Sequence, residues 1–352
     1  MIMNRYSRQI NLPQVGISGQ QKLTNANVLV VGAGGLGCAV LPYLTSAGIG
    51  TIGIIDGDTV DETNLHRQTL YSEKDINLSK AKTAAEHLKK NNSTVSIETY
   101  DAFLNGKNAL DIIPKYDLVI DASDNLTTRY LINDACVLLD KPFIHGSVHQ
   151  FEGQVTVCNY QNGPTYRCLF PEANGNVQNC EEAGVLGTTV GLIGMLQANE
   201  AMKLILDIGE LLSGKLLVYN ALTSSQHIFS FSKKQEPVID KTFYSAQYLN
   251  SYVRNQSITE ALQNDIILID VRETGELPSI EHPNVLKLPL STLELNLDSL
   301  NPENIYAVFC QSGVRSKQAA NILKQQQFKS IICITDGAEA ISKLLKDEKS
   351  IH

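Results

Sequence analysis

Val28-Leu-Val-Val31, followed directly by Gly32-Ala-Gly34-Gly35-Leu-Gly37, is the stretch that decides the fold. The apolar run is typical of a strand buried on both faces of a parallel sheet. A helical pattern from Leu36 to Ala47 comes next, and then a second strand, Thr51 to Ile55, which ends at Asp56. These elements predict one βαβ unit whose glycine turn lets backbone N–H groups approach a phosphate, with a carboxylate placed for ribose hydroxyls.

The alternation of strands and helices continues beyond this unit. A helix around Lys80 to Lys90 leads to a strand near Val95 to Tyr100, and a buried strand, Leu118 to Asp121, precedes a helix from Thr127 to Leu139. This order predicts an α/β fold with a doubly wound, Rossmann-like sheet. Phe151 to Tyr160 alternates as an antiparallel strand does, so we expect a mixed sheet.

Length and composition narrow the class of protein. A chain of 352 residues with 43% hydrophobic residues is expected to form two globular domains, and a net charge of −8 argues against nucleic acid as a partner. The uncharged stretch Ala183 to Ala198 is shorter than the about 20 residues that a membrane span needs. With seven scattered cysteines and no signal peptide, we expect a cytoplasmic protein with reduced thiols and no membrane contact.

A polar, charged stretch from Ser230 to Lys241 is typical of a linker, and an α/β pattern begins again after it. Its strands are expected at Ile266 to Asp270, Tyr306 to Cys310 and Ser330 to Ile334, with a helix from Ser316 to Gln327. We therefore predict a first domain over 1–232, a linker over 233–246 and a smaller α/β domain over 247–352.

Charged residues gather where strands of the first domain end. Asn64-Leu-His-Arg67-Gln68 follows the second strand, Lys80 opens the next helix, and Asp121-Ala-Ser-Asp124-Asn125 ends a later strand. The glycine motif alone is equally typical of NAD or FAD binding, and a plain tight turn is the alternative without function. An oxidoreductase has no need for an arginine, a lysine and an aspartate at one sheet edge, whereas a nucleotidyltransferase uses cations on phosphates and a carboxylate for Mg²⁺.

Several ordered motifs resemble the MoeB/ThiF/HesA family of ubiquitin-activating-enzyme-like adenylyltransferases over about residues 1–230. They are R-Y-S-R-Q at 5–9, V-V-G-A-G-G-L-G at 30–37, I-D-G-D at 55–58, N-L-H-R-Q at 64–68, D-A-S-D-N at 121–125, Y-R-C-L-F-P at 166–171 and C-E-E-A-G-V-L-G at 180–187. The resemblance implies a homodimer that uses ATP and Mg²⁺ to adenylate the C-terminal glycine of a ubiquitin-like sulfur-carrier protein ending in Gly-Gly. The small subunit of molybdopterin synthase is the first candidate, and the thiamine or tRNA-thiolation carrier is the alternative.

The resemblance also implies roles for single residues. Gly35 would contact the ATP phosphates, Asp56 the ribose, Asp124 the Mg²⁺ ion, and Arg8 would reach the partner subunit's site. Asn64, Arg67 and Lys80 would bind the phosphates, with Arg67, Lys80 and Asp124 catalytic. The predicted ATP site is completed by Gly32, Gly34, Gly37, Asp58, Gln68 and Asn125.

The zinc ligands of the family are incomplete here, and the role of Cys180 is left undecided by the sequence. Many members hold zinc with two C-x-x-C pairs, but here the first pair is Thr165-Tyr-Arg-Cys168 and no cysteine stands near the second. One thiol does not make a tetrahedral site, so we expect no zinc and a packed Cys168. Cys180 stands where relatives often have a reactive cysteine. A following helix start favours its thiolate and the adjacent glutamates disfavour it, so catalytic and inert roles both stay open.

The second domain contains Cys310-Gln-Ser-Gly-Val-Arg315 between a strand and a helix. In such a loop the backbone N–H groups point inward and Arg315 adds charge, which favours a thiolate or a persulfide. This loop and Ile269-Asp-Val-Arg-Glu273 resemble rhodanese sulfurtransferases over about 245–345. In that family six-residue loops accompany sulfur substrates and seven-residue loops phosphates, so a phosphatase is the weaker alternative.

The rhodanese resemblance implies that Cys310 carries persulfide sulfur from a donor such as a cysteine desulfurase, with a degenerate docking domain as the alternative. For the whole chain, the other classes left open are a Rossmann oxidoreductase and a scaffold that binds a carrier without turning over ATP.

Overall fold

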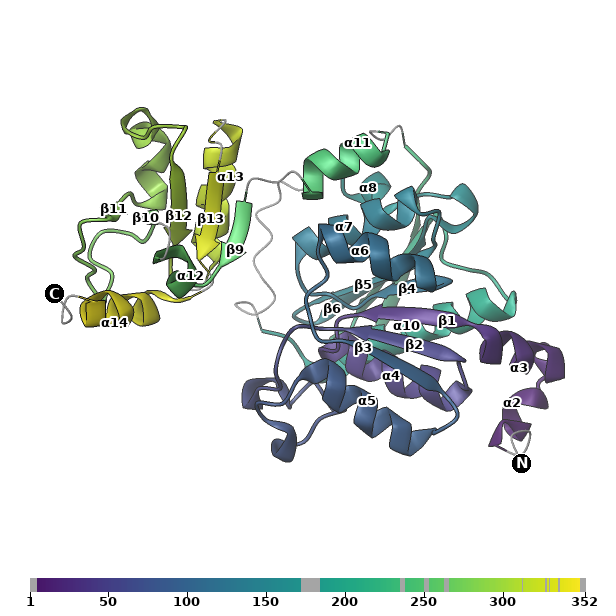
Figure 1. Cartoon of the computed structure of the whole chain (residues 1–352). Helices are drawn as coiled ribbons and strands as arrows, with labels where there is room; N and C mark the ends of the chain where they lie inside the picture. Colours follow the sequence, from purple (N-terminus) through teal and green to yellow (C-terminus); the bar gives the residue numbers. More distant parts are fainter. Residues whose placement is uncertain are drawn as a thin grey trace. The chain divides into compact units, whose positions relative to one another are not determined.

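The computed structural model describes residues 5–171, 184–234, 238–249, 253–262, 266–311, 313–326, 328, 330–334 and 336–348. The chain forms two compact units, Met1–Leu249 and Asn250–His352, each with its own sheet (Figure 1). Each unit is described by itself below.

The first unit is built on one eight-stranded sheet with the order β3-β2-β1-β4-β5-β6-β7-β8. The five strands from β3 to β5 are parallel, and β6, β7 and β8 continue the sheet in antiparallel fashion. The doubly wound, mixed sheet expected from the sequence is thus confirmed. The strands are β1 Asn27–Val31, β2 Thr51–Ile55, β3 Ser96–Tyr100, β4 Leu118–Asp121, β5 Phe143–His149, β6 Glu152–Cys158, β7 Lys215–Asn220 and β8 Ser225–Ser230.

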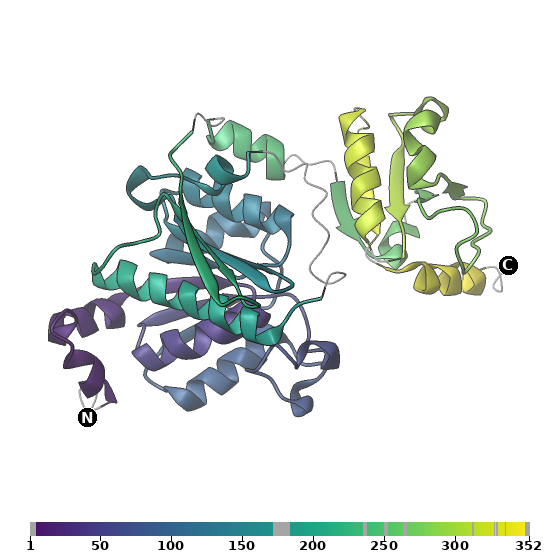
Figure 2. The ribbon, with the colours of Figure 1, turned by 180° about the vertical axis from the view of Figure 1, so that it is seen from behind.

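Helices cover both faces of this sheet. On one face α3, α4, α5 and α10 share a core with the sheet, and on the other α6, α7, α8 and α11 do so (Figures 1 and 2). The helices of this unit are α2 Ser7–Ile10, α3 Gly16–Asn25, α4 Gly35–Ala47, α5 Lys80–Asn91, α6 Gly106–Ile112, α7 Leu126–Leu138, α8 Tyr166–Leu169, α10 Gly187–Leu206 and α11 Lys241–Tyr244.

Strand β1 shows why Val28 to Val31 is a continuous apolar run. Val28 and Val30 belong to the core beneath α4 and α10, whereas Leu29 and Val31 belong to the core on the opposite face. All four side chains are buried. Because successive side chains of a strand point to opposite faces, a strand covered by helices on both sides needs an apolar residue at every position.

The segment after β8 packs against the first unit, which differs from the linker expected over 233–246. Tyr244 at the end of α11 is buried, and its hydroxyl donates to the carbonyl of Gly106 at 3.1 Å. In the π-helical turn Ser245–Leu249, the Tyr248 hydroxyl donates to Oδ2 of Asp134 at 2.6 Å. Asp134 also forms a buried ion pair with Arg167. Together with Leu249, which packs against the same core, these two tyrosines extend the compact unit to Leu249.

We predict that Tyr248→Phe lowers the free energy of unfolding of the first unit, because it removes the hydrogen bond to the buried Asp134 carboxylate. A hydrogen bond to a charged group contributes about 1.5–3 kcal/mol, and chemical denaturation of the full chain measures the change. Tyr219→Phe on β7 is the matched control, since its half-buried ring makes no hydroxyl hydrogen bond among the described residues. Equal stability of the two variants would show that the Tyr248 contact contributes nothing.

The second unit is a five-stranded parallel sheet with the order β11-β10-β12-β13-β9. Helix α13 packs on one face of this sheet, and α12 and α14 pack on the other. The smaller α/β domain expected from the sequence is confirmed. Its elements are β9 Val253–Gln256, α12 Ile258–Leu262, β10 Ile267–Asp270, β11 Val285–Lys287, β12 Ile305–Phe309, α13 Val314–Gln325, β13 Ser330–Ile334 and α14 Ala338–Glu348.

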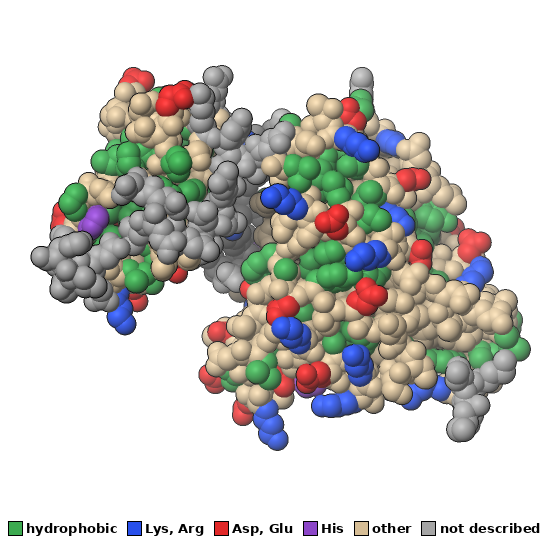
Figure 3. Space-filling view, viewed as in Figure 1, with side chains coloured by type: hydrophobic (Ala, Val, Ile, Leu, Met, Phe, Trp, Pro, Cys, Tyr) green, Lys and Arg blue, Asp and Glu red, His purple; other side chains and the backbone are tan. Residues whose placement is uncertain are grey.

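Surface charge and helix length bear on nucleic acid and membrane, the two partners that the sequence argues against. On the face shown in Figure 3, the Lys and Arg side chains of the first unit are interspersed with Asp and Glu. Interspersed charges lack the single-sign stripe typical of a nucleic-acid-binding face. Within the part of the chain that the structure describes, no helix is both long and apolar enough to cross a membrane.

Candidate active site

The glycine turn lies where the strand order of the first sheet changes direction, between β1 and β4. Gly32 has a φ of +99°, and a Cβ there would lie 2.6 Å from the carbonyl oxygen of Ala122. A Cβ on Gly37 would lie 2.2 Å from the carbonyl oxygen of Gly32. Both positions therefore require glycine, and helix α4 can begin directly against the end of β1. Such a crevice at the carboxyl ends of the strands is where open α/β sheets bind ligands.

Two side chains fasten this turn to the elements around it. Oδ2 of Asp56 accepts the N–H of Ala33 at 2.7 Å, and Oδ1 accepts the N–H of Asp58 at 2.8 Å. Burial raises the pKa of Asp56, while these hydrogen bonds oppose the rise. The Tyr71 hydroxyl lies 2.8 Å from the carbonyl oxygen of Ala33 and 3.1 Å from that of Lys80. Tyr71 was missed from the sequence because no motif includes it.

The N-terminus of α10 meets the N-terminus of α4 at this turn. A Cβ on Gly35 would lie 2.6 Å from Cγ1 of Val190 in the first turn of α10, and one on Gly187 would lie 3.5 Å from Cα of Arg67. Helix N-termini carry partial positive charge and free N–H groups. Two of them beside an arginine form a binding site for anions, phosphates above all. The convergence depends on contacts between distant segments, so sequence spacing did not reveal it.

Arg67 lies half-buried between these helix ends. Its Nη2 donates to Oδ1 of Asn64 at 2.6 Å, and its Nη1 lies near the carbonyl of Thr63 and the ring of His66. None of these partners carries negative charge, so the positive charge of the guanidinium is not neutralised by them. Arg67 and Asn64 are thus brought together as the sequence predicts.

Gln68 supplies a test of whether a nucleotide fits. Its side chain is buried beside Gly34, and its Oε1 has no hydrogen-bond partner among the described residues. A buried amide oxygen needs a donor. A ribose hydroxyl or an adenine amino group carries one, so the residues around the glycine turn fit ATP.

Lys80 opens helix α5 and is nearly buried, with 7% of its side chain exposed. Its Nζ lies 3.2 Å from Oδ2 of Asp58, whose side chain is 53% exposed. The exposed Asp58 carboxylate turns to solvent with little cost, whereas the Lys80 side chain is held by the packing around it. A bound phosphate can therefore compete with Asp58 for the ammonium group.

Asp124 follows β4 and is exposed to solvent. The turn before it is held by Asp121, whose carboxylate accepts the N–H and hydroxyl of Ser123 at 3.1 and 2.6 Å and Nδ1 of His145 at 2.7 Å. Burial lowers the pKa of His145, so its ring is neutral. Asn125 caps α7 by accepting the N–H of Thr128 at 2.9 Å.

The donor set at Asp124 fits a metal ion that arrives with a nucleotide. Among the described residues, no group of three or more His, Cys, Asp or Glu side chains is placed to hold a metal ion. Mg²⁺ keeps several waters and is commonly bound by one or two carboxylates together with substrate phosphates. A single exposed aspartate beside the phosphate site meets that requirement.

Arg8 is not brought to this site within one chain. It is exposed on α2, whose neighbours Tyr6 and Gln9 contact Gly48 and Ala47 at the C-terminal end of α4. The glycine turn lies at the other end of this 13-residue helix, roughly 20 Å away at 1.5 Å per residue. A role for Arg8 therefore requires a second subunit.

Two cysteines of the first unit, Cys168 and Cys180, were singled out from the sequence. Cys168 is buried as expected, and its Sγ accepts the N–H groups of Thr165 at 3.3 Å and Lys234 at 3.4 Å. These contacts link the 165–168 turn to the strand end beyond β8. Cys180 lies outside the described residues.

In the second unit, Cys310 follows the central strand β12 and is 1% exposed. Its Sγ accepts the N–H of Gly313 at 3.1 Å and that of Ser316 at 3.4 Å. Gly313 has a φ of +80° and precedes α13, so the helix begins directly at the sulfur. Two N–H donors at a helix N-terminus stabilise a thiolate. Cys310 and Arg315, the ends of the predicted loop, thus lie at this helix start, and Ser312 between them lies outside the described residues.

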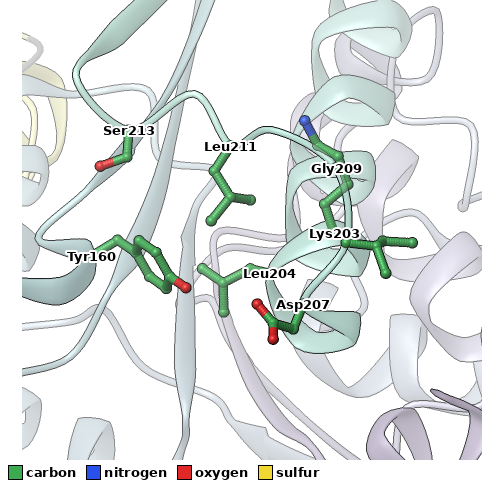
Figure 4. Close-up of a pocket in the computed structure, with 8 residues that line it drawn as sticks. Tyr160, Lys203, Leu204, Asp207, Gly209, Leu211 and Ser213 are labelled. Carbon is green, nitrogen blue, oxygen red and sulfur yellow. The ribbon is translucent and has the colours of Figure 1, made fainter. Parts of the chain in front are cut away.

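A separate pocket of about 190 Å³ lies at the C-terminal end of α10. Figure 4 shows Tyr160 and Ser213 on one side and Lys203, Leu204 and Asp207 of the helix end on the other. The glycine turn lies at the opposite end of this 20-residue helix, roughly 30 Å away. None of the predicted site residues lines this pocket.

Comparison with known proteins now adds to the geometry. The model of the ThiF family matches residues 6–238. This chain belongs to the ThiF family. The model of the rhodanese-like domain matches residues 253–344. Membership of the ThiF family excludes the Rossmann oxidoreductase that the glycine motif left open. The match to the rhodanese-like domain confirms the resemblance of the second unit.

Individual relatives agree with this ThiF-family assignment. "Adenylyltransferase and sulfurtransferase MOCS3" of Culex quinquefasciatus is 52% identical, over 99% of this chain and 89% of that protein. "Sulfur carrier protein adenylyltransferase" of Thermus thermophilus is 50% identical, over 63% of this chain and 85% of that protein. A solved structure of E. coli MccB with ATP matches with a TM-score of 0.59 and 26% identity, over 67% of this chain and 73% of that one.

We predict that Gly37→Ala in this ThiF-family chain weakens ATP binding at least about tenfold, because a Cβ against the Gly32 carbonyl displaces the turn. Overpacking of this kind also costs roughly 1–3 kcal/mol of stability. Titration with ATP and chemical denaturation measure the two effects. Gly191→Ala is the matched control, because a Cβ at this helical position meets nothing within 4 Å. That variant is expected to bind ATP normally and to gain about 0.5–1 kcal/mol. Equal ATP affinity in both variants would contradict the steric constraint.

Proposed function

We propose that this chain adenylates the C-terminal carboxylate of a ubiquitin-like sulfur-carrier protein, and that its second unit supplies the sulfur for a thiocarboxylate. The observation that carries the proposal is the meeting of two helix N-termini with the unneutralised Arg67 at the glycine turn. Preorganised positive charge of this kind stabilises the charge that develops on phosphates during nucleotidyl transfer. ThiF-family membership and the names of the relatives support the carrier protein as the acceptor.

In this proposal ATP and the carrier's terminal carboxylate bind side by side at the glycine turn. The carboxylate attacks the α-phosphate, the bond to the β-phosphate breaks, and an acyl-adenylate and pyrophosphate form. Arg67, Lys80 and the two helix N-termini hold the phosphates and their developing charge. Asp56 holds the ribose. Asp124 would hold Mg²⁺, which supplies further charge neutralisation on the phosphates when bound.

The second unit provides the nucleophile for the next step. Cys310 accepts a sulfur atom as a persulfide from a donor such as a cysteine desulfurase. The terminal persulfide sulfur attacks the activated carbonyl and AMP leaves, which yields an acyl disulfide. A second thiol, Cys180 or an external one, reduces this disulfide and releases the thiocarboxylate. Joining both activities in one chain raises the effective concentration of the persulfide near the adenylate.

Three finer parts belong to the same proposal. The chain acts as a homodimer in which Arg8 completes the partner subunit's site, since Arg8 lies far from the glycine turn of its own chain. The molybdopterin synthase small subunit is the first candidate carrier, and the thiamine and tRNA-thiolation carriers are the alternatives. A scaffold without turnover is the opposing hypothesis.

The test is ATP–pyrophosphate exchange with each candidate carrier in turn, with the same carrier lacking its terminal glycines as the negative control. Exchange with one intact carrier would establish adenylation and identify the substrate. ATP binding without exchange with any carrier would favour the scaffold.

We predict that Arg67→Ala lowers this exchange at least about 100-fold, because the loss of an electrostatic stabiliser acts on the transition state. Lys74→Ala, which removes an exposed cation on the 3₁₀ turn Glu73–Asp75, is the matched control and is expected to exchange normally. Persulfide formation on Cys310 should be unchanged in both variants. Normal exchange by the Arg67 variant would remove Arg67 from the active site.

A further inference from the structure

The Cys310 loop ends in an arginine that is already bound to a carboxylate. Arg315 and Glu276 form a bidentate ion pair, through Nη1 to Oε1 and through Nη2 to Oε2 at 2.8 Å. Glu276 comes from the segment after β10, and its Oε1 also accepts the N–H of Glu273 at 2.8 Å. The pair is about one-third exposed, at 29% for Arg315 and 34% for Glu276. The hydrogen bond from Arg315 lowers the pKa of Glu276 to about 2, so the glutamate is ionised at neutral pH.

A second arginine beside the loop is neutralised in the same way. Arg272 is 5% exposed and donates through Nε and Nη2 to both oxygens of Asp270, at 2.9 and 2.6 Å. Its charge lies close enough to act on Glu276, and that of Arg315 acts on Arg272, so the two arginines form one cluster with Glu276 and Asp270. Both arginines of this cluster thus face a carboxylate, and the cluster presents no net positive charge.

This pairing bears on the kind of sulfur donor that Cys310 accepts. A small dianionic donor such as thiosulfate must bring two negative charges to a thiolate, and it needs a free cation to offset the repulsion. A guanidinium that donates two parallel hydrogen bonds to one carboxylate has its best-placed N–H donors already in use. A persulfide presented by another protein brings its own contacts and depends less on a cation within the loop.

We propose that Glu276 is a specificity-determining residue, which holds Arg315 away from small anionic sulfur donors and so restricts Cys310 to persulfide sulfur. The inference rests on the sulfur-transfer role proposed above. Glu276 acts through Arg315 and is a positioning residue.

The reaction used as the test is the transfer of sulfur from thiosulfate to cyanide. The Cys310 thiolate attacks the outer sulfur of thiosulfate, the S–S bond breaks, and sulfite leaves with the electron pair. Cyanide then removes the terminal sulfur of the persulfide as thiocyanate and restores the thiolate.

We predict that Glu276→Ala in the full chain raises kcat/KM for thiosulfate at least about tenfold, mainly through a lower KM, because Arg315 is freed to bind the dianion. The gain should shrink with rising salt, as an exposed charge contact does. Glu276→Gln should give a smaller gain, since an amide still accepts a hydrogen bond from the guanidinium. Glu281→Gln removes the carboxylate that pairs with Lys287 in the same unit and is the matched control, expected to behave as the unchanged chain.

The double variant Glu276→Ala/Arg315→Ala separates specificity from loop stability. If Glu276 acts through Arg315, the double variant shows no gain over Arg315→Ala alone. Persulfide formation on Cys310 from a persulfide-loaded cysteine desulfurase, followed by mass spectrometry, is measured in parallel and should stay within about threefold in Glu276→Ala.

Two results would overturn the inference. Unchanged or lower kcat/KM for thiosulfate in Glu276→Ala, with normal charging by the persulfide-loaded desulfurase, would sink the role of Glu276 and leave the proposed function intact. Failure of the unchanged chain to take sulfur from the persulfide-loaded desulfurase, with no thiosulfate turnover in any variant, would sink both the inference and the sulfur-transfer role.

Discussion

The first unit depends on the absence of a side chain at two positions of one turn. The carbonyl oxygen of Gly32 lies where a Cβ of Gly37 would stand, and the carbonyl of Ala122 lies where a Cβ of Gly32 would stand. Helix α4 can therefore begin against β1 and β4. Helix α10 approaches α4 equally closely, because a Cβ on Gly194 would lie 2.7 Å from the carbonyl oxygen of Leu36. The position of α4 thus sets that of α10, and with it the second helix N-terminus beside Arg67.

Much of this fold could be predicted because its signals are local. The buried run Val28 to Val31 and the strand Leu118 to Asp121 have the apolar pattern of strands covered on both faces, and the structure places strands there. The expected helix from Thr127 to Leu139 lies within one residue of α7 at each end. For the site, the sequence indicated that residues following strand ends gather at one sheet edge. Asn64, Arg67 and Gln68 do lie at the glycine turn.

What could not be predicted depends on contacts between distant segments. The uncharged stretch before Ala198 was recognised as too short for a membrane span, but nothing in it showed that helix α10 begins beside Arg67. Tyr71 contacts carbonyls of two other elements, and Tyr248 contacts Asp134, which precedes it by 114 residues. The polar, charged stretch that ends at Lys241 indicated a linker, and the tyrosines that follow it belong to no motif that would reveal the docking.

The two sites share one arrangement of strand, turn and helix but differ in whether the nearby arginines are neutralised. Each has a strand that ends at a turn, and a helix whose N-terminus faces the reacting group. At the glycine turn the guanidinium of Arg67 has only neutral partners, which favours a polyanion such as ATP. At Cys310 both neighbouring arginines are paired with carboxylates. One helix start therefore attracts charged phosphate, and the other supports a thiolate through its N–H groups while the neighbouring arginines are neutralised.

The burial of Cys310 has a consequence for the lifetime of a bound sulfur atom. With 1% of the residue exposed and two N–H groups on its Sγ, the sulfur is shielded from water and from thiols in bulk solution. A persulfide is easily oxidised or reduced when it is accessible. In a persulfide on this residue the inner sulfur atom keeps this shielding, so the second unit can hold the sulfur in the interval between its arrival and its use.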